Sequence, residues 1–195
     1  MAKESTIKNM AITLTVICLV SSAILGGVYS ITKDPIEMAQ VAKTNSAISK
    51  VVPKFDNDPS AELFNIEVGG KSYKVYPAKM SGNIVGYAVE SYTSAGFGGR
   101  INLMVGFNID STIVNTAVLS HNETPGLGDK MVEGKSDFSV QFKGKNPEDF
   151  KISVKKDGGD VDAITASTIS SRAFCDAVNS AYKVFLECTK QNKKE

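Results

Sequence analysis

The chain has 195 residues, with 22 basic and 21 acidic side chains, one histidine and three cysteines. This length suffices for one domain with a substantial hydrophobic core. The near balance of charge excludes the strongly basic surface that nucleic-acid binding needs, so no nucleic-acid partner is expected. One histidine and no Cys-x-x-Cys pair leave little material for a metal site, and none is expected. No Walker or dinucleotide-binding glycine pattern occurs in the sequence.

An uncharged, mostly apolar run begins at Met10 and ends at Tyr29. At about 1.5 Å per helical residue, these positions span roughly the 30 Å of a bilayer core. We therefore expect a transmembrane helix over residues 10–30, after a cytoplasmic tail of residues 1–9. Lys3 and Lys8 favour an inside N-terminus in the cytoplasmic membrane, with the rest of the chain on the extracytoplasmic side. A cleaved signal peptide is the alternative, but the run is longer than its usual apolar core.

The residues after this span are expected to form a connecting helix within residues 31–53. Asp34 followed by Pro35 is typical of a helix N-cap and first helical position, and Pro53 is expected to end the helix. Apolar residues recur on one broad face of this segment. That face predicts an arm that packs on the domain that follows.

From about residue 54 the pattern changes to alternating apolar and polar residues, which is typical of strands. Gly69-Gly70 and Asp110-Ser111 each predict a hairpin turn. An amphipathic helix, with an apolar face from Ile169 to Cys188, closes the domain. Strands linked by hairpins and followed by a helix predict an α+β fold with a mainly antiparallel sheet and flanking helices over residues 54–190, before a frayed tail of residues 191–195. The expected strands are residues 63–68, 72–76, 83–92, 101–107, 112–118 and 150–154.

One acid and five hydroxyl residues are concentrated in residues 162–171, directly before the terminal helix. A helix N-terminus carries unpaired N–H groups and a partial positive charge, so it suits a phosphate. The alternative interpretation is that one serine or threonine of this cluster is simply the N-cap.

A second stretch, residues 121–128, reads His-Asn-Glu-Thr-Pro-Gly-Leu-Gly and follows an expected strand. Its two glycines allow positive φ or close approach of a ligand to the backbone, and Pro125 fixes a turn. A turn alone does not explain why histidine, glutamate, threonine and leucine share this loop. The composition therefore favours a binding loop.

Together the two stretches resemble the flavin-binding domain of the G subunit of Rnf complexes and of the related C subunit of sodium-pumping quinone reductases. That family carries a loop like His-x-Glu-Thr-Pro-Gly-Leu-Gly, and it esterifies FMN to the last threonine of Asp-x-x-(Ser/Thr)-Gly-Ala-Thr. Here Ala166 replaces the usual glycine and Ser167 the usual alanine, which adds a second hydroxyl beside the acceptor. The acid, first-hydroxyl and acceptor positions are filled by Asp162, Thr165 and Thr168.

The resemblance implies covalent FMN, attached as a phosphoester to Thr168. Asp162 is expected to serve recognition by the attaching enzyme, and Glu123 to orient the loop or modulate the flavin potential. His121 is expected to satisfy the local structure or to tune the flavin, and the glycines of residues 96–99 to form either a tight connection or a further wall. The other expected cofactor-binding residues are Thr124, Gly126, Leu127, Gly128, Thr165 and Ser167.

The function that the resemblance implies is a membrane-anchored electron relay with no catalytic residues and no complete activity of its own. It would belong to an Rnf-type complex that moves electrons between ferredoxin and NAD while transporting Na⁺ or H⁺. The implied partners are other integral-membrane and redox subunits, together with a flavin transferase that uses FAD and a divalent metal. The alternatives are the quinone-reductase C subunit, a stand-alone extracytoplasmic flavin carrier, and a non-redox membrane-anchored binding or scaffold module.

Overall fold

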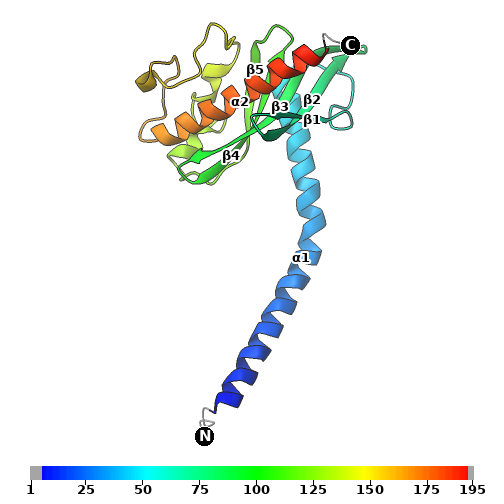
Figure 1. Ribbon diagram of the computed structural model, residues 1–195, viewed down its shortest axis with the longest axis vertical. Helices are drawn as coiled ribbons and strands as arrows, with labels where there is room; N and C mark the ends of the chain where they lie inside the picture. The colour runs from blue at the N-terminus through cyan, green and yellow to red at the C-terminus, as the bar shows by residue number, and fades with distance from the viewer. Residues whose placement is uncertain (1–5, 193–195) are drawn as a thin grey trace. The chain divides into compact units, whose positions relative to one another are not determined.

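The computed structural model describes residues 6–192, which fall into two compact units divided between Lys43 and Thr44 (Figure 1). The first unit is helical from Ile7 onward, and the second holds a five-stranded sheet and a long helix. The expected tail of residues 1–9 lies partly outside the described residues, as do Lys3 and the last three positions of the expected frayed tail.

The helix α1 runs from Ile7 to Val51 and is long and apolar enough to cross a membrane. Its apolar side chains are not covered by protein: Leu19 is 65% exposed and Leu25 is 72% exposed. The expectation of a separate helix that starts at Asp34 was wrong, because α1 continues through Pro35. A proline removes one backbone hydrogen bond but leaves the helical turns on either side intact, so a helix of 45 residues can accommodate it.

The sheet is an antiparallel meander with the strand order β1-β2-β3-β4-β5. The hairpin turns expected at Gly69-Gly70 and at Asp110-Ser111 are confirmed, and Ser111 adopts a φ of +70°. β3 and β4 are longer than the sequence pattern predicted, so their hairpin ends at the glycine-rich residues 96–99. The strand bounds are β1 Phe64–Val68, β2 Lys71–Met80, β3 Asn83–Gly96, β4 Gly99–Asn108 and β5 Ile113–Ser120.

The helix α2, Thr168–Asn192, lies across one face of this sheet and packs chiefly on β3 and β4 (Figure 1). Its apolar face is confirmed over most of its length, and Phe185 stacks on Phe107 of β4 with ring centroids 4.9 Å apart. Ile169 departs from the expectation, because it is 50% exposed in the first turn. The buried thiols of Cys175 and Cys188 belong to this core, and burial raises the pKa of each to about 12.

The end of α1 packs on the opposite face of the sheet, which confirms the packing-arm interpretation only for the last turns of the helix, because Ile36 and Val41 are exposed. Ile48 and Val51 are buried against apolar residues of β2, β3 and β4, among them Met104. The approach is close, because a Cβ at Gly106 would overlap the carbonyl oxygen of Val51. The sheet therefore has a core on each face.

The strand expected at residues 150–154 does not form. Val154 makes only an isolated bridge with Val161, and the amide of Lys151 donates instead to the Asp160 carboxylate at 2.7 Å. The backbone of this segment thus bonds within its own loop and, at the Ile152 carbonyl, to the Asn179 side chain of α2 at 2.7 Å, and it does not join the sheet. Ile152 and Val154 are nevertheless buried in the core, so the alternation reported burial and not strand pairing.

Candidate functional site

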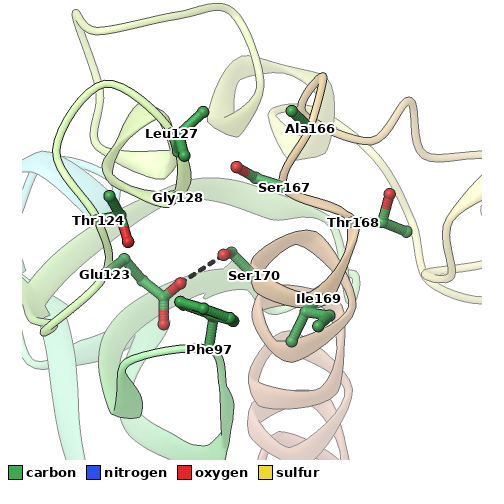
Figure 2. Close-up of a pocket in the computed structure, with 10 residues that line it drawn as sticks. All are labelled: Phe97, Glu123, Thr124, Leu127, Gly128, Ala166, Ser167, Thr168, Ile169 and Ser170. Carbon is green, nitrogen blue, oxygen red and sulfur yellow. Dashed lines mark hydrogen bonds between the residues drawn. The ribbon is translucent and has the colours of Figure 1, made fainter.

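The two stretches singled out in the sequence meet at one cavity of about 360 Å³ (Figure 2). This volume lies within the range of about 300–1,000 Å³ that is usual for small-molecule sites. Its walls come from the tip of the β3–β4 hairpin, the loop after β5 and the first turn of α2. The lining residues are Phe97, Glu123, Thr124, Leu127, Gly128, Ala166, Ser167, Thr168, Ile169 and Ser170.

The turn that leads into α2 is organised by Ser171. Its hydroxyl accepts a hydrogen bond from the amide of Ile164 at 2.9 Å and donates to the carbonyl of Ser167 at 2.9 Å. The Ser167 amide in turn donates to the Ile164 carbonyl at 3.0 Å. Ser167 holds the N-cap position of α2, because its carbonyl accepts from the Ser171 amide at 3.0 Å. Among the described residues, however, the hydroxyls of Ser167 and Thr168 have no hydrogen-bond partner, so neither side chain makes the capping bond that the alternative interpretation proposed.

The two adjacent hydroxyl side chains, Ser167 and Thr168, differ in exposure and direction. Ser167 is 7% exposed, and its hydroxyl is directed into the cavity toward Leu127 (Figure 2). Thr168 is half-buried at the rim, and its side chain points away from the other lining residues. One hydroxyl therefore faces the inside of the cavity, while the other is accessible from outside.

Glu123 joins the three walls of the cavity. It is 5% exposed, accepts a hydrogen bond from the amide of Gly98 at 2.9 Å through Oε1, and accepts a second from the hydroxyl of Ser170 through Oε2. A Cβ at Gly98 would overlap the carbonyl oxygen of Asn122, so the hairpin tip approaches the loop backbone directly. The tight-connection interpretation of the glycine-rich tip is therefore correct, and the tip also provides Phe97 as a wall.

His121 serves the internal structure of the loop. Its Nδ1 accepts a hydrogen bond from the amide of Glu123 at 3.1 Å, and it is not among the residues that line the cavity. Asp129, which follows the loop, is 7% exposed and pairs with Lys135 at 2.7 Å. The Lys135 ammonium group holds the pKa of the Asp129 carboxyl below its usual value. This carboxylate is thus charged at neutral pH, and it lies in the first turn of the 3₁₀ segment Gly128–Met131.

Three predicted site residues lie outside this cavity. Gly126 does not line the cavity, and its φ of +77° is a backbone conformation that glycine adopts more easily than other residues. Thr165 and Asp162 line a separate cavity on the other side of the segment. Asp162 is exposed, pairs with Lys155 at 2.8 Å, and has its amide and carbonyl held by the Gln141 side chain at 2.8 and 3.1 Å.

Three residues that line the cavity were not expected from the sequence. Phe97 stands between Gly96 and Gly98, and an aromatic residue flanked by glycines was the available signal. Ile169 was assigned to the helix core because its spacing fits that face. Ser170 was counted only as a member of the hydroxyl cluster, and its bond to Glu123 joins positions 47 residues apart.

Ala166 adopts a φ of +59°, the left-handed conformation in which glycine is favoured. An L-residue there costs about 1–2 kcal/mol, whereas glycine costs about 0.4–1 kcal/mol through the entropy of the unfolded chain. We expect Ala166→Gly to raise the free energy of unfolding by up to about 1 kcal/mol, because the exposed Ala166 methyl group makes little packing contact. Thermal unfolding measures the change. Ala166→Val is the matched control and should destabilise the domain. A lower stability of Ala166→Gly than of Ala166→Val would show that the backbone at Ala166 is not strained.

The lining combines two kinds of chemistry that suit FMN. Phe97, Leu127 and Ile169 offer exposed apolar surface for a planar ring system, at 71%, 41% and 50% exposure. The hydroxyls of Ser167 and Thr168 lie at the N-terminus of α2, where a phosphate is favoured by the helix dipole. The residues present therefore fit both the ring and the phosphate end of the cofactor.

Comparison with known proteins agrees with this geometry. The sequence model of the FMN-binding domain matches residues 96–183, and that of the RnfG N-terminal region matches residues 1–51. The protein is thus an FMN-binding domain that follows a helix able to span a membrane.

Full-length relatives define the family more closely. The chain is 36% identical over 184 residues to the G subunit of the ion-translocating oxidoreductase complex of Vibrio atlanticus (strain LGP32), an overlap of 90% of this chain and 88% of the relative. It is 33% identical over 184 residues to the protein of the same name from Escherichia coli (strain K12), with 90% and 89% covered. The chain belongs to the family of G subunits of ion-translocating oxidoreductase complexes.

Proposed function

We propose that this chain carries electrons within an ion-translocating oxidoreductase complex through an FMN esterified to Thr168 and held in the cavity. Its family makes it a membrane-anchored FMN subunit of such a complex, and other subunits of that complex are its partners. When bound, FMN supplies the redox chemistry, and the protein supplies position and electrostatics. The observation that carries the proposal is the meeting of the 123–128 loop and the first turn of α2 at one cavity.

Attachment at Thr168, and not at the neighbouring Ser167, is supported by exposure. An external enzyme must reach the acceptor oxygen, and the Thr168 side chain is at the rim and points outward. Ser167 is 7% exposed and directed inward, so its hydroxyl is less accessible to an external enzyme. The two hydroxyls, which the sequence pattern leaves as rivals, are therefore not equivalent.

The chain's own residues do not provide the attachment chemistry. Within residues 6–192, no group of three or more histidine, cysteine, aspartate or glutamate side chains is arranged to hold a metal ion. Phosphoryl transfer to an ordinary threonine depends on metal-assisted positioning of the donor. A separate flavin transferase, which uses FAD and a divalent metal, is accordingly part of the proposal. Asp162 is accessible to it, because its side chain is 66% exposed beside Lys155.

Acid precipitation tests the covalent bond. The full chain, produced with a flavin transferase and purified in mild detergent, should remain yellow in the pellet after precipitation. FMN held without a covalent bond would pass into the supernatant and contradict the ester. A colourless protein would favour the non-redox scaffold module instead.

Orientation is the second part of the proposal. We expect the N-terminus on the cytoplasmic side and residues 44–195 on the extracytoplasmic side of the cytoplasmic membrane, because basic residues precede the span. Protease added to cells whose outer layers have been removed should then cut beyond Ser30 without lysis. Protection of the domain until the membrane is broken would reverse the orientation.

The G subunit is favoured over the quinone-reductase C subunit by the match of residues 1–51 and by the names of the relatives. Purification from native membranes distinguishes a subunit of a complex from a stand-alone flavin carrier. A member of a complex should co-purify with integral-membrane redox proteins. Purification only as a single chain from native membranes would favour the stand-alone carrier.

A further inference from the structure

The hydroxyl of Ser167 lines the cavity without serving the fold. Ser167 as a whole is 7% exposed, and its side chain has no hydrogen-bond partner among the residues that the structure describes. Its oxygen is not among the fully buried unpaired side-chain atoms, so the cavity leaves it accessible to a ligand. Its oxygen is directed across the cavity toward Leu127 and away from the helix backbone (Figure 2). The missing partner is therefore to be sought inside the cavity.

The other buried serines of this turn provide a comparison. Ser170 donates to Glu123, and Ser171 bonds to the backbone of Ile164 and Ser167. Both hydroxyls are consumed by contacts that hold the fold together. Ser167 is buried to a similar degree but contributes no such contact through its hydroxyl. Its backbone already closes the turn, so the hydroxyl group is not required for the local structure.

The chemistry of the cavity indicates what the hydroxyl meets. Ser167 lies next to the proposed acceptor Thr168 and at the N-terminus of α2, where the phosphate end of FMN is expected. The phosphate and ribityl groups present oxygens that accept a hydrogen bond. The Glu123 carboxylate, the nearest anionic group on the lining, is already engaged by Gly98 and Ser170.

We propose that the Ser167 hydroxyl donates a hydrogen bond to the phosphate–ribityl arm of FMN, and that Ser167 is thus a cofactor-binding residue in addition to the attachment site. This inference rests on the proposed function. The motif usually has alanine at this position, and the serine found here would add a direct contact with the cofactor. The hydroxyl is unpaired in the flavin-free domain and becomes satisfied when the cofactor is present.

A thermodynamic cycle tests this contact. The full chain and its Ser167→Ala variant are each prepared with and without the flavin transferase, and the Tm of the domain is measured in the same mild detergent. Without flavin, Ser167→Ala should leave Tm nearly unchanged, because the hydroxyl makes no bond to the described part of the protein. With flavin, the same change should lower Tm. The coupling between the two effects should be about 2–4 °C, the value of one ordinary hydrogen bond in a domain of this size.

Ser171→Ala is the matched control, since it removes a buried hydroxyl from the same turn. It should lower Tm equally with and without flavin, because its partners are backbone groups of the protein. An equal effect of Ser167→Ala in the two forms would overturn the proposal. Peptide mass mapping of the loaded proteins keeps the two hypotheses apart, because flavin found on Thr168 upholds the attachment site whatever the cycle shows. Flavin found on Ser167 would overturn both.

Discussion

Replacing Thr168 with alanine is expected to give a folded, colourless protein when the flavin transferase is present. Thr168 is half-buried at the rim of the cavity, and its hydroxyl has no partner among the described residues. The change therefore removes the acceptor oxygen without breaking a structural bond, and the free energy of unfolding should change by less than about 1 kcal/mol. In-gel flavin fluorescence and peptide mass mapping measure attachment, and circular dichroism verifies the fold.

Two neighbouring hydroxyls serve as controls for this prediction. Thr165→Ala removes an exposed hydroxyl that lies on the other cavity, and Ser167→Ala removes the inward-facing one. Both variants should retain a flavin that maps to the peptide containing Thr168. Flavin that survives in Thr168→Ala, or that maps to Ser167 in the unaltered chain, would contradict the assignment.

The sheet was predictable because its signals are local. Alternation of apolar and polar residues fixed the strands, and Gly69-Gly70 marked a turn that needs positive φ at both glycines. The terminal helix was equally predictable from its spacing. The segment of residues 150–154 was not, because alternation reports which side chains are buried, while pairing depends on which backbone is adjacent. That backbone bonds to Asp160 in its own loop.

The prediction that a second helix starts at Asp34 was wrong for a related reason. Asp34-Pro35 is a sound local signal for a helix N-terminus, but α1 had already formed on its N-terminal side and continues through it. Local capping chemistry indicates where a helix can begin, and it does not require the preceding residues to be non-helical. The apolar span itself was recognisable because its length is dictated by the bilayer.

The candidate site was predictable in its two motif stretches, whereas for the third wall two interpretations of residues 96–99 stayed open. The resemblance placed the loop of residues 121–128 beside the first turn of α2. That Phe97 joins them could not be decided from a local pattern, since its hairpin tip is held by hydrogen bonds between distant positions. Likewise, Gly126 fits the motif, but its φ of +77° explains the glycine without any contact with a ligand.

Those distant bonds make Glu123 the other position where a large effect is expected. Glu123→Ala removes the acceptor of the Gly98 amide and of the Ser170 hydroxyl in a buried setting. Each group left unsatisfied costs about 1–3 kcal/mol, so the loss of both partners should lower the free energy of unfolding by about 2–6 kcal/mol. The hairpin tip that carries Phe97 would also lose its tie to the loop. Flavin loading should therefore decrease, as measured by flavin absorbance per protein.

Two further variants separate the role of the carboxylate from that of the loop in general. Glu123→Gln keeps one carbonyl oxygen to accept from the Gly98 amide, and its NH2 group can donate to the Ser170 hydroxyl oxygen, but both bonds lose the negative charge that strengthens them. Its stability and flavin loading should fall between those of the unaltered chain and Glu123→Ala. Asn122→Ala changes an exposed neighbour and should alter stability by no more than about 0.5 kcal/mol. Equal effects of Asn122→Ala and Glu123→Ala would show that the buried carboxylate does not hold the three walls together.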